Sequence, residues 1–147
     1  MNRYTSFMLL DAHAHLARGP QASRPYRTFL NATTTREFDT VALAAARDSA
    51  VFPFFGVHPW YVHTVPDDWQ EKLRTYVMHM HCGIGEIGLD SVYAQKHSYA
   101  ADLDRQVVLF HEQLALALEF DRPAAIHCVK AWDRLFDELE QLRQEKK

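Results

Sequence analysis

The sequence is poor in the features that define several classes of protein. It has no apolar run close to the ~18 residues that a membrane span needs, so we expect no transmembrane segment. Its 16 basic and 19 acidic residues give a net charge of −3, which argues against a broad basic surface that holds nucleic acid through many phosphates. Any phosphate partner is therefore expected at a local site.

Cysteine is also scarce. Only Cys82 and Cys128 occur, far apart and without a C-x-x-C pair, and the N-terminal residues lack the long apolar core of a secretory signal. We therefore expect a reduced, cytoplasmic protein. The content of 48% hydrophobic and 12% aromatic residues is enough for one core and predicts a single domain over 1–147.

Short apolar runs alternate with amphipathic segments along the chain. The runs have the length of strands and cover 7–10, 28–32, 51–57, 83–87 and 124–128. Between and after them, the pattern predicts helices over 35–49 (following a threonine cap), 67–80, 102–120 and 131–145. This alternation predicts an α/β fold with a parallel sheet.

The last two predicted helices carry apolar residues at spacings of three and four, which place them on one face. We expect each face to pack against the sheet. The first set is Leu103, Val107, Phe110, Leu114 and Leu118, and the second is Trp132, Leu135, Phe136, Leu139 and Leu142.

Nine histidines are the unusual part of the composition. His13 and His15 follow the first apolar run, and alternate strand residues point to the same side, so both imidazoles face one way. Imidazole is the commonest transition-metal ligand, so the two can share one ion. An H-x-H pair also arises by chance in a histidine-rich chain, so a metal site needs further ligands.

Two later runs supply such ligands. Glu86 lies inside an apolar, glycine-rich run, where a carboxylate needs a cation, a hydrogen-bond network or a proton. His127 lies at the carboxyl end of the last run, and taken alone it fits a hydrogen-bonded core histidine. Because the carboxyl ends of parallel strands form one functional edge, we expect both to converge with the earlier histidine pair on a divalent ion.

Four motifs follow one another along the chain: DAHAHL (11–16), FFGVHPWYV (54–62), GIGEIGLD (83–90) and RPAAIHCVKAWDRL (122–135). Together they resemble the TatD-type metal-dependent hydrolases of the amidohydrolase superfamily, from about Phe7 to the end of the chain. The resemblance implies (β/α) units of a TIM barrel, with about five of its eight strands in this sequence. It also implies hydrolysis of phosphodiester or related ester bonds, typically by deoxyribonucleases, with one or two divalent ions such as Zn, Mn or Mg.

The resemblance implies roles for the metal-binding side chains. His13 and His15 bind one metal, Glu86 is the catalytic carboxylate that bridges toward a second, and His127 binds that second metal. Asp90 orients a ligand or the following loop without touching the metal itself.

Two further residues are implied to contact substrate. His58, in GVHP, lies in the same mouth of the barrel, where it touches substrate or fixes the turn before Pro59. Lys130 contacts a phosphate as a point charge or is a solvated lysine at a helix start.

The sequence departs from the family in its length. A (β/α)8 barrel takes ~250 residues, and the family's histidine after the sixth strand and aspartate near the end of the eighth are not in this sequence. We therefore expect a truncated hydrolase that is slow, single-metal or inactive. The alternative is a non-catalytic metal- or phosphate-binding half-barrel remnant.

The predicted substrate is a phosphate ester, with DNA as a candidate, although amidohydrolase-like sites also cleave amides and lactones. An incomplete barrel leaves its first and fifth strands as edges and exposes an apolar lumen, so we expect self-association or a completing chain. The remaining histidines are expected to have no metal role: the pair His79 and His81 beside Cys82 at the opposite end of the sheet, and the exposed His63, His97 and His111. His97 follows Asp90 on the functional side of the sheet, so contact with substrate is the alternative for it.

Overall fold

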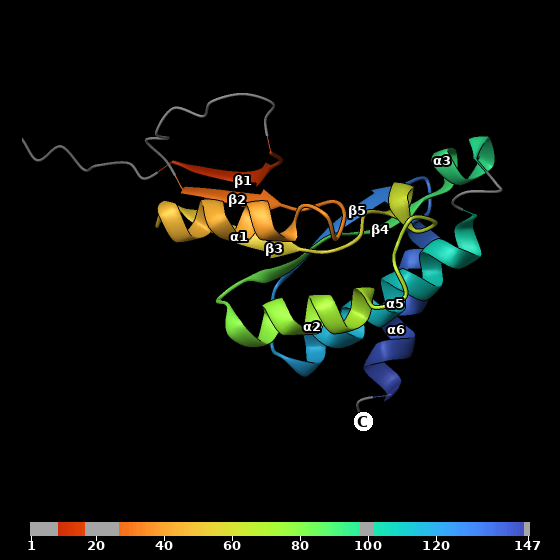
Figure 1. Ribbon diagram of the computed structural model, residues 1–147. Coiled ribbons are helices and arrows are strands. Elements are labelled where there is room, and N and C mark those ends of the chain that lie inside the picture. The colour runs from red at the N-terminus through yellow and green to blue at the C-terminus, as the bar shows by residue number, and fades with distance from the viewer. Residues whose placement is uncertain (1–8, 17–26, 98–101, 146–147) are drawn as a thin grey trace, which may run out of the picture.

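A computed structural model describes residues 9–16, 27–97 and 102–145 of the chain. Five strands form one parallel sheet in the order β1-β2-β3-β4-β5. They are β1 (Leu10–Ala14), β2 (Arg27–Asn31), β3 (Val51–Phe55), β4 (Gly83–Asp90) and β5 (Ala124–Val129). The sheet curls like part of a barrel wall (Figure 1). The predicted α/β fold with a parallel sheet is confirmed.

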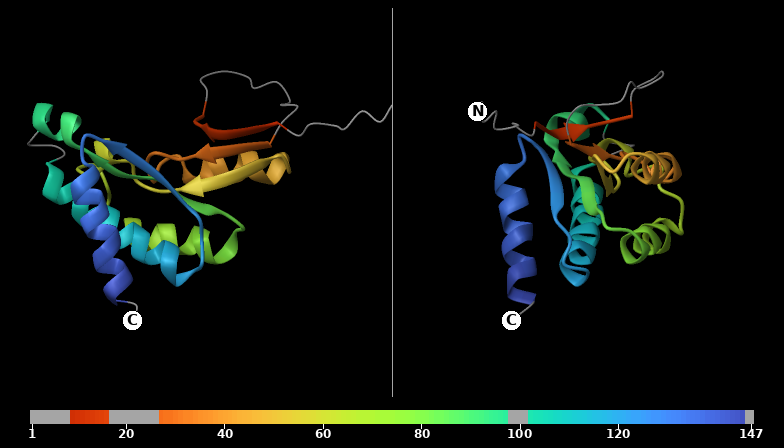
Figure 2. Two further views of the ribbon diagram at one scale, coloured as in Figure 1. Left: turned by 180° about the vertical axis from the view of Figure 1, so that it is seen from behind. Right: turned by 90° about the vertical axis from the view of Figure 1, so that its left-hand side faces the viewer.

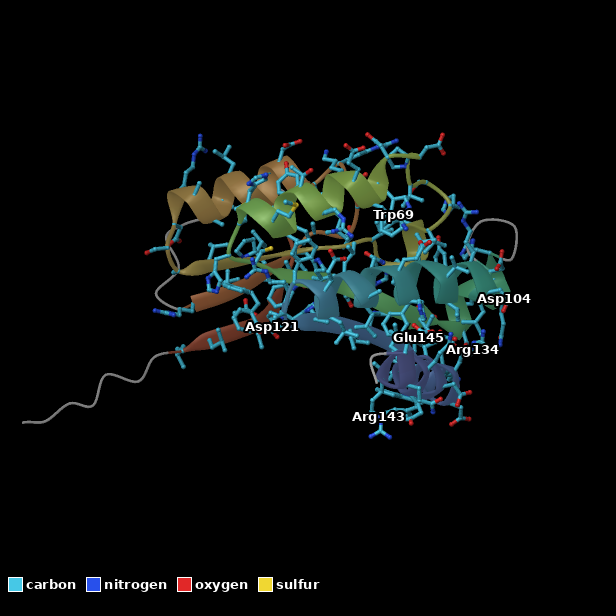
Figure 3. All side chains as sticks on the ribbon, turned by 90° about the horizontal axis from the view of Figure 1, so that it is seen from below. Trp69, Asp104, Asp121, Arg134, Arg143 and Glu145 are labelled. Carbon is cyan, nitrogen blue, oxygen red and sulfur yellow. The ribbon has the colours of Figure 1, made fainter. Side chains whose placement is uncertain are left out.

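The longer helices lie outside the curve of this wall, whereas the two short ones, η1 and α3, lie beyond the ends of the strands, as Figure 2 shows. They are α1 (Phe38–Arg47), the short 3-10 helix η1 (Pro59–Tyr61), α2 (Trp69–His79), α3 (Ser91–Lys96), α5 (Leu103–Glu119) and α6 (Trp132–Glu145). Figure 3 places Asp104 and Asp121 near opposite ends of α5, and Arg143 on α6, which stands apart from α1 and α2. None of the described helices combines the length and apolarity needed to cross a bilayer.

Several predicted boundaries were wrong. The first strand was expected to include the run 7–10, of which residues 7 and 8 lie outside the described part, and to end in Asp11–His15; β1 begins at Leu10, contains His13 as expected, and ends at Ala14, before His15. Helix α1 has no threonine cap, since its N-cap residue is Glu37, whose carboxylate accepts bonds from the backbone and hydroxyl of Thr33. Helix α3 was not predicted, and β4 runs to Asp90, beyond the expected end at 87.

The predicted apolar faces are partly correct. On α5, Val107, Phe110 and Leu114 are buried, whereas Leu118 is 40% exposed. On α6, buried Leu135 and Leu142 face the sheet, but Trp132 and Phe136 are 55% and 59% exposed. Because β5 is the edge strand of the described sheet, the outer side of α6 has no further strand beside it.

Candidate metal centre

The path of β4 decides where Glu86 lies. Strands β3 and β4 are paired at Phe54 with Gly83 and at Phe55 with Ile84, and beyond these pairs the two strands separate. The backbone N–H of Glu86 instead donates to the carbonyl of Ala32, just after β2, at 3.3 Å. Strand β4 thus carries Glu86 across toward the β1–β2 side of the sheet.

Glycines permit this close approach of the strands. A Cβ at Gly56 would lie 3.0 Å from the backbone carbonyl of Gly85 and 2.8 Å from the side chain of Ile87. At Gly88, φ is +140° and a Cβ would meet the carbonyl oxygen of His127 at 2.0 Å. Larger residues at either position would push apart the strands that bear the site.

Two glutamines of α5 hold the backbone on either side of the site. The amide of Gln113 accepts from the N–H of Val57 at 2.7 Å and donates to its carbonyl at 3.2 Å. Gln106 makes the same pair of contacts with Asp90, at 2.7 and 3.3 Å. Both glutamines are fully buried, so these bonds replace strand pairing where the sheet opens.

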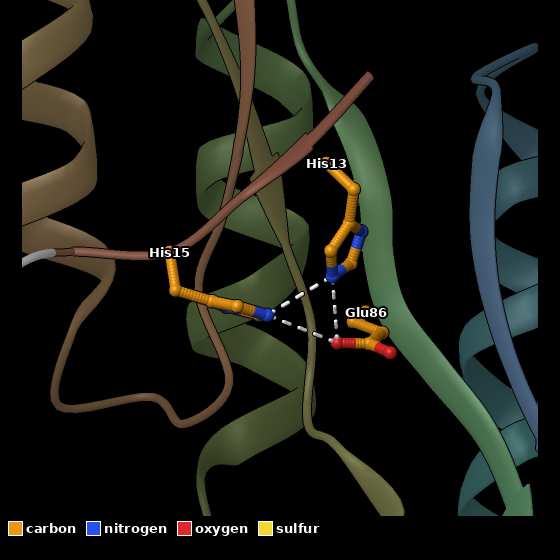
Figure 4. Close-up of side chains that lie close together, drawn as sticks. All are labelled: His13, His15 and Glu86. Atoms are coloured by element: carbon orange, nitrogen blue, oxygen red, sulfur yellow. Dashed lines mark hydrogen bonds and ion pairs between the residues drawn. The ribbon is translucent and has the colours of Figure 1, made fainter. Parts of the chain in front are cut away.

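The first histidine group lies between β1 and β4 (Figure 4). The Nε2 atoms of His13 and His15 are 3.0 Å apart, and they lie 3.2 and 3.3 Å from Oε2 of Glu86. The two imidazoles are exposed, whereas Glu86 is buried. Two nitrogens and one carboxylate oxygen thus converge on one point.

Asn31, at the end of β2, supports this group. Its backbone carbonyl lies 3.2 Å from Nδ1 of His15, which fits a proton on Nδ1 that is donated to this carbonyl. The Nε2 atom of His15 then carries a lone pair that points toward His13 and Glu86. Its side-chain Nδ2 lies 3.3 Å from Nδ1 of His13. Within the described residues, the buried Oδ1 of Asn31 has no hydrogen-bond partner.

The second histidine group uses the other oxygen of the same carboxylate. Nδ1 of His127 lies 2.9 Å from Oε1 of Glu86, and Nε2 of His58 lies 3.8 Å from it. On its other side, His127 presents Nε2 to Oδ2 of Asp90 at 3.4 Å. Glu86 therefore faces one histidine group with each of its two oxygens.

The turn after β3 sets the proton position of His58. Its Nδ1 accepts from the backbone N–H of Trp60 at 3.2 Å, as a residue that fixes the turn before Pro59 would. Neutral His58 then carries its proton on Nε2, which faces the site as a donor. This geometry favours contact with substrate over metal ligation, although His58 also belongs to a group close enough to hold an ion.

Charges in the site follow from burial and from these contacts. Burial alone would raise the pKa of Glu86, but the hydrogen bond with His127 and the neighbouring imidazoles lower it to about 2. Burial lowers the pKa of His58 to about 4. Burial would also lower the pKa of His127, yet Glu86 and Asp90 outweigh it and raise that pKa. At neutral pH the site thus holds an ionised Glu86 and a neutral His58.

The first group fits a divalent ion. Two ligands bound 2.0–2.2 Å from one ion, at right or tetrahedral angles, lie about 2.8–3.6 Å apart. The separations among His13, His15 and Glu86 are 3.0, 3.2 and 3.3 Å. Two imidazoles and one carboxylate suit Zn, Mn and related ions without selecting one of them.

The other predicted residues lie apart from these two groups. Lys130 is exposed directly after β5, with a positive φ of 49°. His79 and His81 lie near the start of β4, and His81 packs against the ring of Phe52. His63 and His97 are exposed as expected.

The expectation of an exposed His111 was wrong. It is only partly exposed, because its Nδ1 contacts the buried carboxylate of Glu138 on α6 at 3.2 Å. This contact joins α5 to α6 and lies outside the two histidine groups.

Sequence reasoning missed three polar positions around the site. Asn31 ends a short apolar run, and a polar residue at a strand end was the available signal. Gln106 and Gln113 are seven residues apart and adjoin the apolar positions of α5, so helical spacing places them on its buried face. Their backbone partners are not visible in the sequence.

Comparison with known proteins adds a family match. The model of the family described as TatD related DNase matches residues 10–147. The chain is 36% identical over 104 residues to the 3'-5' ssDNA/RNA exonuclease TatD of Yersinia pseudotuberculosis, which covers 67% of this chain and 38% of that protein. It is 24% identical to the Cut9-interacting protein scn1 of Schizosaccharomyces pombe, covering 89% of this chain and 58% of that protein.

Among solved structures, the chain resembles the crystal structure of YjjV, a TatD homologue from Escherichia coli K12. The TM-score is 0.68 at 25% identity, over 79% of this chain and 44% of that one. The match confirms the predicted fold, the (β/α) units of a TIM barrel with five of the strands. The chain spans between 38% and 58% of the length of these relatives.

Proposed function

Because this chain belongs to the TatD related DNase family, as its motifs predicted, we propose that it is a metal-dependent hydrolase of phosphodiester or related ester bonds. The observation that carries the proposal is the position of Glu86, whose two carboxylate oxygens face two separate histidine groups. We propose nucleic acid as the substrate class, since the Yersinia relative is named an exonuclease of single-stranded DNA and RNA.

In this proposal His13, His15 and Glu86 hold one divalent ion, and Glu86 and His127 hold a second. A bound ion supplies an activated water and neutralises charge that develops on the phosphoryl oxygens. Asp90 accepts the Nε2 proton of His127, which orients that imidazole and leaves its Nδ1 free to bind the ion.

The remaining residues act on substrate. His58 donates a hydrogen bond from its Nε2–H to a phosphoryl oxygen, since the bond from the backbone N–H of Trp60 to Nδ1 keeps the proton on Nε2. Lys130, exposed after β5, attracts a phosphate as a point charge. Both roles are consistent with a local phosphate site in a chain without excess positive charge.

A nuclease assay tests the proposal. We expect a labelled single-stranded oligonucleotide to be cleaved with Mn²⁺, Zn²⁺ or Mg²⁺ and to remain intact with EDTA. Glu86→Gln replaces one carboxylate oxygen by an NH₂ group and removes the negative charge that faces both histidine groups, so it should slow cleavage on the order of 100-fold or more. Glu71→Gln, an exposed glutamate on α2, is the matched control and should cleave like the wild type.

Equal rates for the wild type and Glu86→Gln would remove the enzymatic claim. If the wild type binds metal and cleaves nothing, the chain fits the alternative function, a metal- or phosphate-binding half-barrel. The same histidine and glutamate positions would support that alternative, because binding needs convergence of ligands and no catalytic water.

We further propose that a second copy or another chain covers the open edge of the sheet. The support is the exposed Ile126 on edge strand β5 together with exposed Trp132 and Phe136 on α6. The two cysteines, both unpaired, support a reducing compartment such as the cytoplasm.

A further inference from the structure

Three aromatic rings form a stack at the carboxyl end of the sheet. The rings of Trp60 and Tyr93 are 5.1 Å apart and 15° from parallel, and those of Tyr93 and His97 are 4.3 Å apart and 28° from parallel. Trp60 lies in η1, which follows β3. Tyr93 lies in α3, which follows β4, and His97 is the C-cap residue of α3. We call Trp60, Tyr93 and His97 the aromatic stack.

Asp90 fixes this stack beside the candidate metal centre. Its Oδ2 accepts from Nε1 of Trp60 at 2.7 Å, and its Oδ1 accepts from the backbone N–H of Tyr93 at 2.8 Å. The same Oδ2 lies 3.4 Å from His127. One carboxylate therefore sets the position of two stacked rings and of one histidine of the site.

The stack is both close to the site and open to solvent. The ring of Trp60 is 5.1 Å from that of His58 and 6.4 Å from that of His127. Trp60 is nevertheless 40% exposed, whereas Trp69 on α2 is 7% exposed. A tryptophan whose polar group is fixed and whose ring stays exposed offers apolar surface for a flat ligand.

We propose that the aromatic stack binds an unpaired base of a single-stranded nucleic acid, whose neighbouring phosphate lies at His58. This inference rests on the proposed function and adds to it the position that binds a base of the substrate. In a duplex the base faces are already stacked on each other, so an exposed aromatic face selects unpaired bases with little regard to sequence. Stacking also supplies affinity that the net charge of −3 does not provide through phosphate contacts.

The test compares the binding of two internally labelled DNA pentamers by fluorescence anisotropy with EDTA present, so that no hydrolysis occurs. One pentamer is unmodified, and the other has an abasic residue at one end, with each end tried in turn. We expect the wild type to bind the unmodified pentamer ~5- to 100-fold more tightly than the abasic one at one of the two ends.

Two variants assign this preference to Trp60. Trp60→Leu should bind both pentamers equally, because it removes the ring. Trp60→Phe keeps a ring but loses the bond to Asp90, so it should retain most of the preference. Equal binding of both pentamers by the wild type would overturn the inference, as would an undiminished preference in Trp60→Leu.

The experiment separates this inference from the proposed function. A preference for the unmodified pentamer without metal-dependent cleavage would support the aromatic stack and contradict the hydrolase. Cleavage that depends on Glu86, with no loss of binding to the abasic pentamer, would support the hydrolase and contradict the stack.

Discussion

At the scale of single residues, the site depends on Glu86, because no other described side chain contacts both histidine groups. Its carboxylate is buried, and a buried charge is costly unless neighbouring groups stabilise it. The hydrogen bond from His127 and the imidazoles of His58 and His13 provide that stabilisation in the metal-free protein. Glu86 is thus both a candidate ligand and a contributor to folding.

The dependence of stability on pH tests this second role. The pKa of Glu86 falls from an ordinary 4.5 to about 2 on folding. The ionised carboxylate therefore stabilises the folded state fully when the pH is above the ordinary pKa of 4.5, and this stabilisation is lost as the pH falls toward the folded-state pKa of about 2. We expect the Tm of metal-free protein to drop over this window, and Glu86→Gln to drop less steeply.

Thermal unfolding followed by circular dichroism in EDTA measures this slope. Glu71→Gln is the control, since its exposed carboxylate should leave the wild-type slope unchanged. A Glu86→Gln variant with the same slope as the wild type would contradict the assigned charge state.

At this scale, residue type and strand periodicity in the sequence predict which side chains can converge, but not the contacts that set their protonation. The prediction that the imidazoles of His13 and His15 lie on one side is correct, although strand alternation accounts for it only in part, since His15 lies one residue beyond the end of β1. The proton position of His58 was not predictable, since it depends on a backbone N–H from Trp60 in a turn. The metal-binding roles themselves stay predictions.

At the scale of elements, α5 acts as a support for two strand ends. Gln106 and Gln113 bond the backbone at Asp90 and Val57, and His58 follows Val57 directly. Strands β3 and β4 have separated at this level, so these amides bond backbone groups that the two strands no longer pair with each other, while β4 stays paired with β5.

Replacing Gln113 by leucine keeps the volume but leaves the N–H and carbonyl of Val57 without partners. Each unsatisfied buried group costs ~1–3 kcal/mol, so for two groups we expect a loss of about 2–6 kcal/mol in the free energy of unfolding. Urea denaturation measures it, with Gln70→Leu on the exposed side of α2 as the control. A loss no larger than that of Gln70→Leu would show that the amide is dispensable.

Elements were predicted best where burial and periodicity agree. β2 and β5 lie close to their expected bounds, because their apolar runs are also the paired segments. The apolar run 7–10 predicted the start of β1 poorly, because β1 is an exposed edge strand. Backbone pairing with β2 holds it in place, so its position does not depend on burying apolar side chains. Helix α3 follows β4 directly, with Asp90 as its N-cap residue. It is only six residues long, which is too short for helical periodicity to be detected in the sequence.

At the scale of the whole molecule, the described chain is an open wall of five strands with two edges, β1 and β5. The outer side of α6 carries Trp132 and Phe136, whose rings are 6.2 Å apart. Ile126, on the edge strand β5, is exposed as well, and exposed apolar side chains near an unpaired edge favour contact with another chain.

Light scattering after size-exclusion chromatography tests this expectation. We expect a mass above the 17.0 kDa of one chain. Phe136→Lys should lower the measured mass toward that of a single chain, whereas Met78→Lys, at an exposed methionine on α2, should leave the wild-type mass unchanged. A wild type that elutes entirely as one chain would contradict self-association.

The central claim is that side chains from β1, β4 and β5 together bind a divalent ion, and calorimetric titration with Zn²⁺ or Mn²⁺ tests it most directly. We expect one or two ions per chain, with at least ~10-fold weaker binding in His13→Ala and wild-type binding in the control His63→Ala, at an exposed histidine outside both groups. A wild type that binds no ion, or equal affinities for the two variants, would contradict the claim.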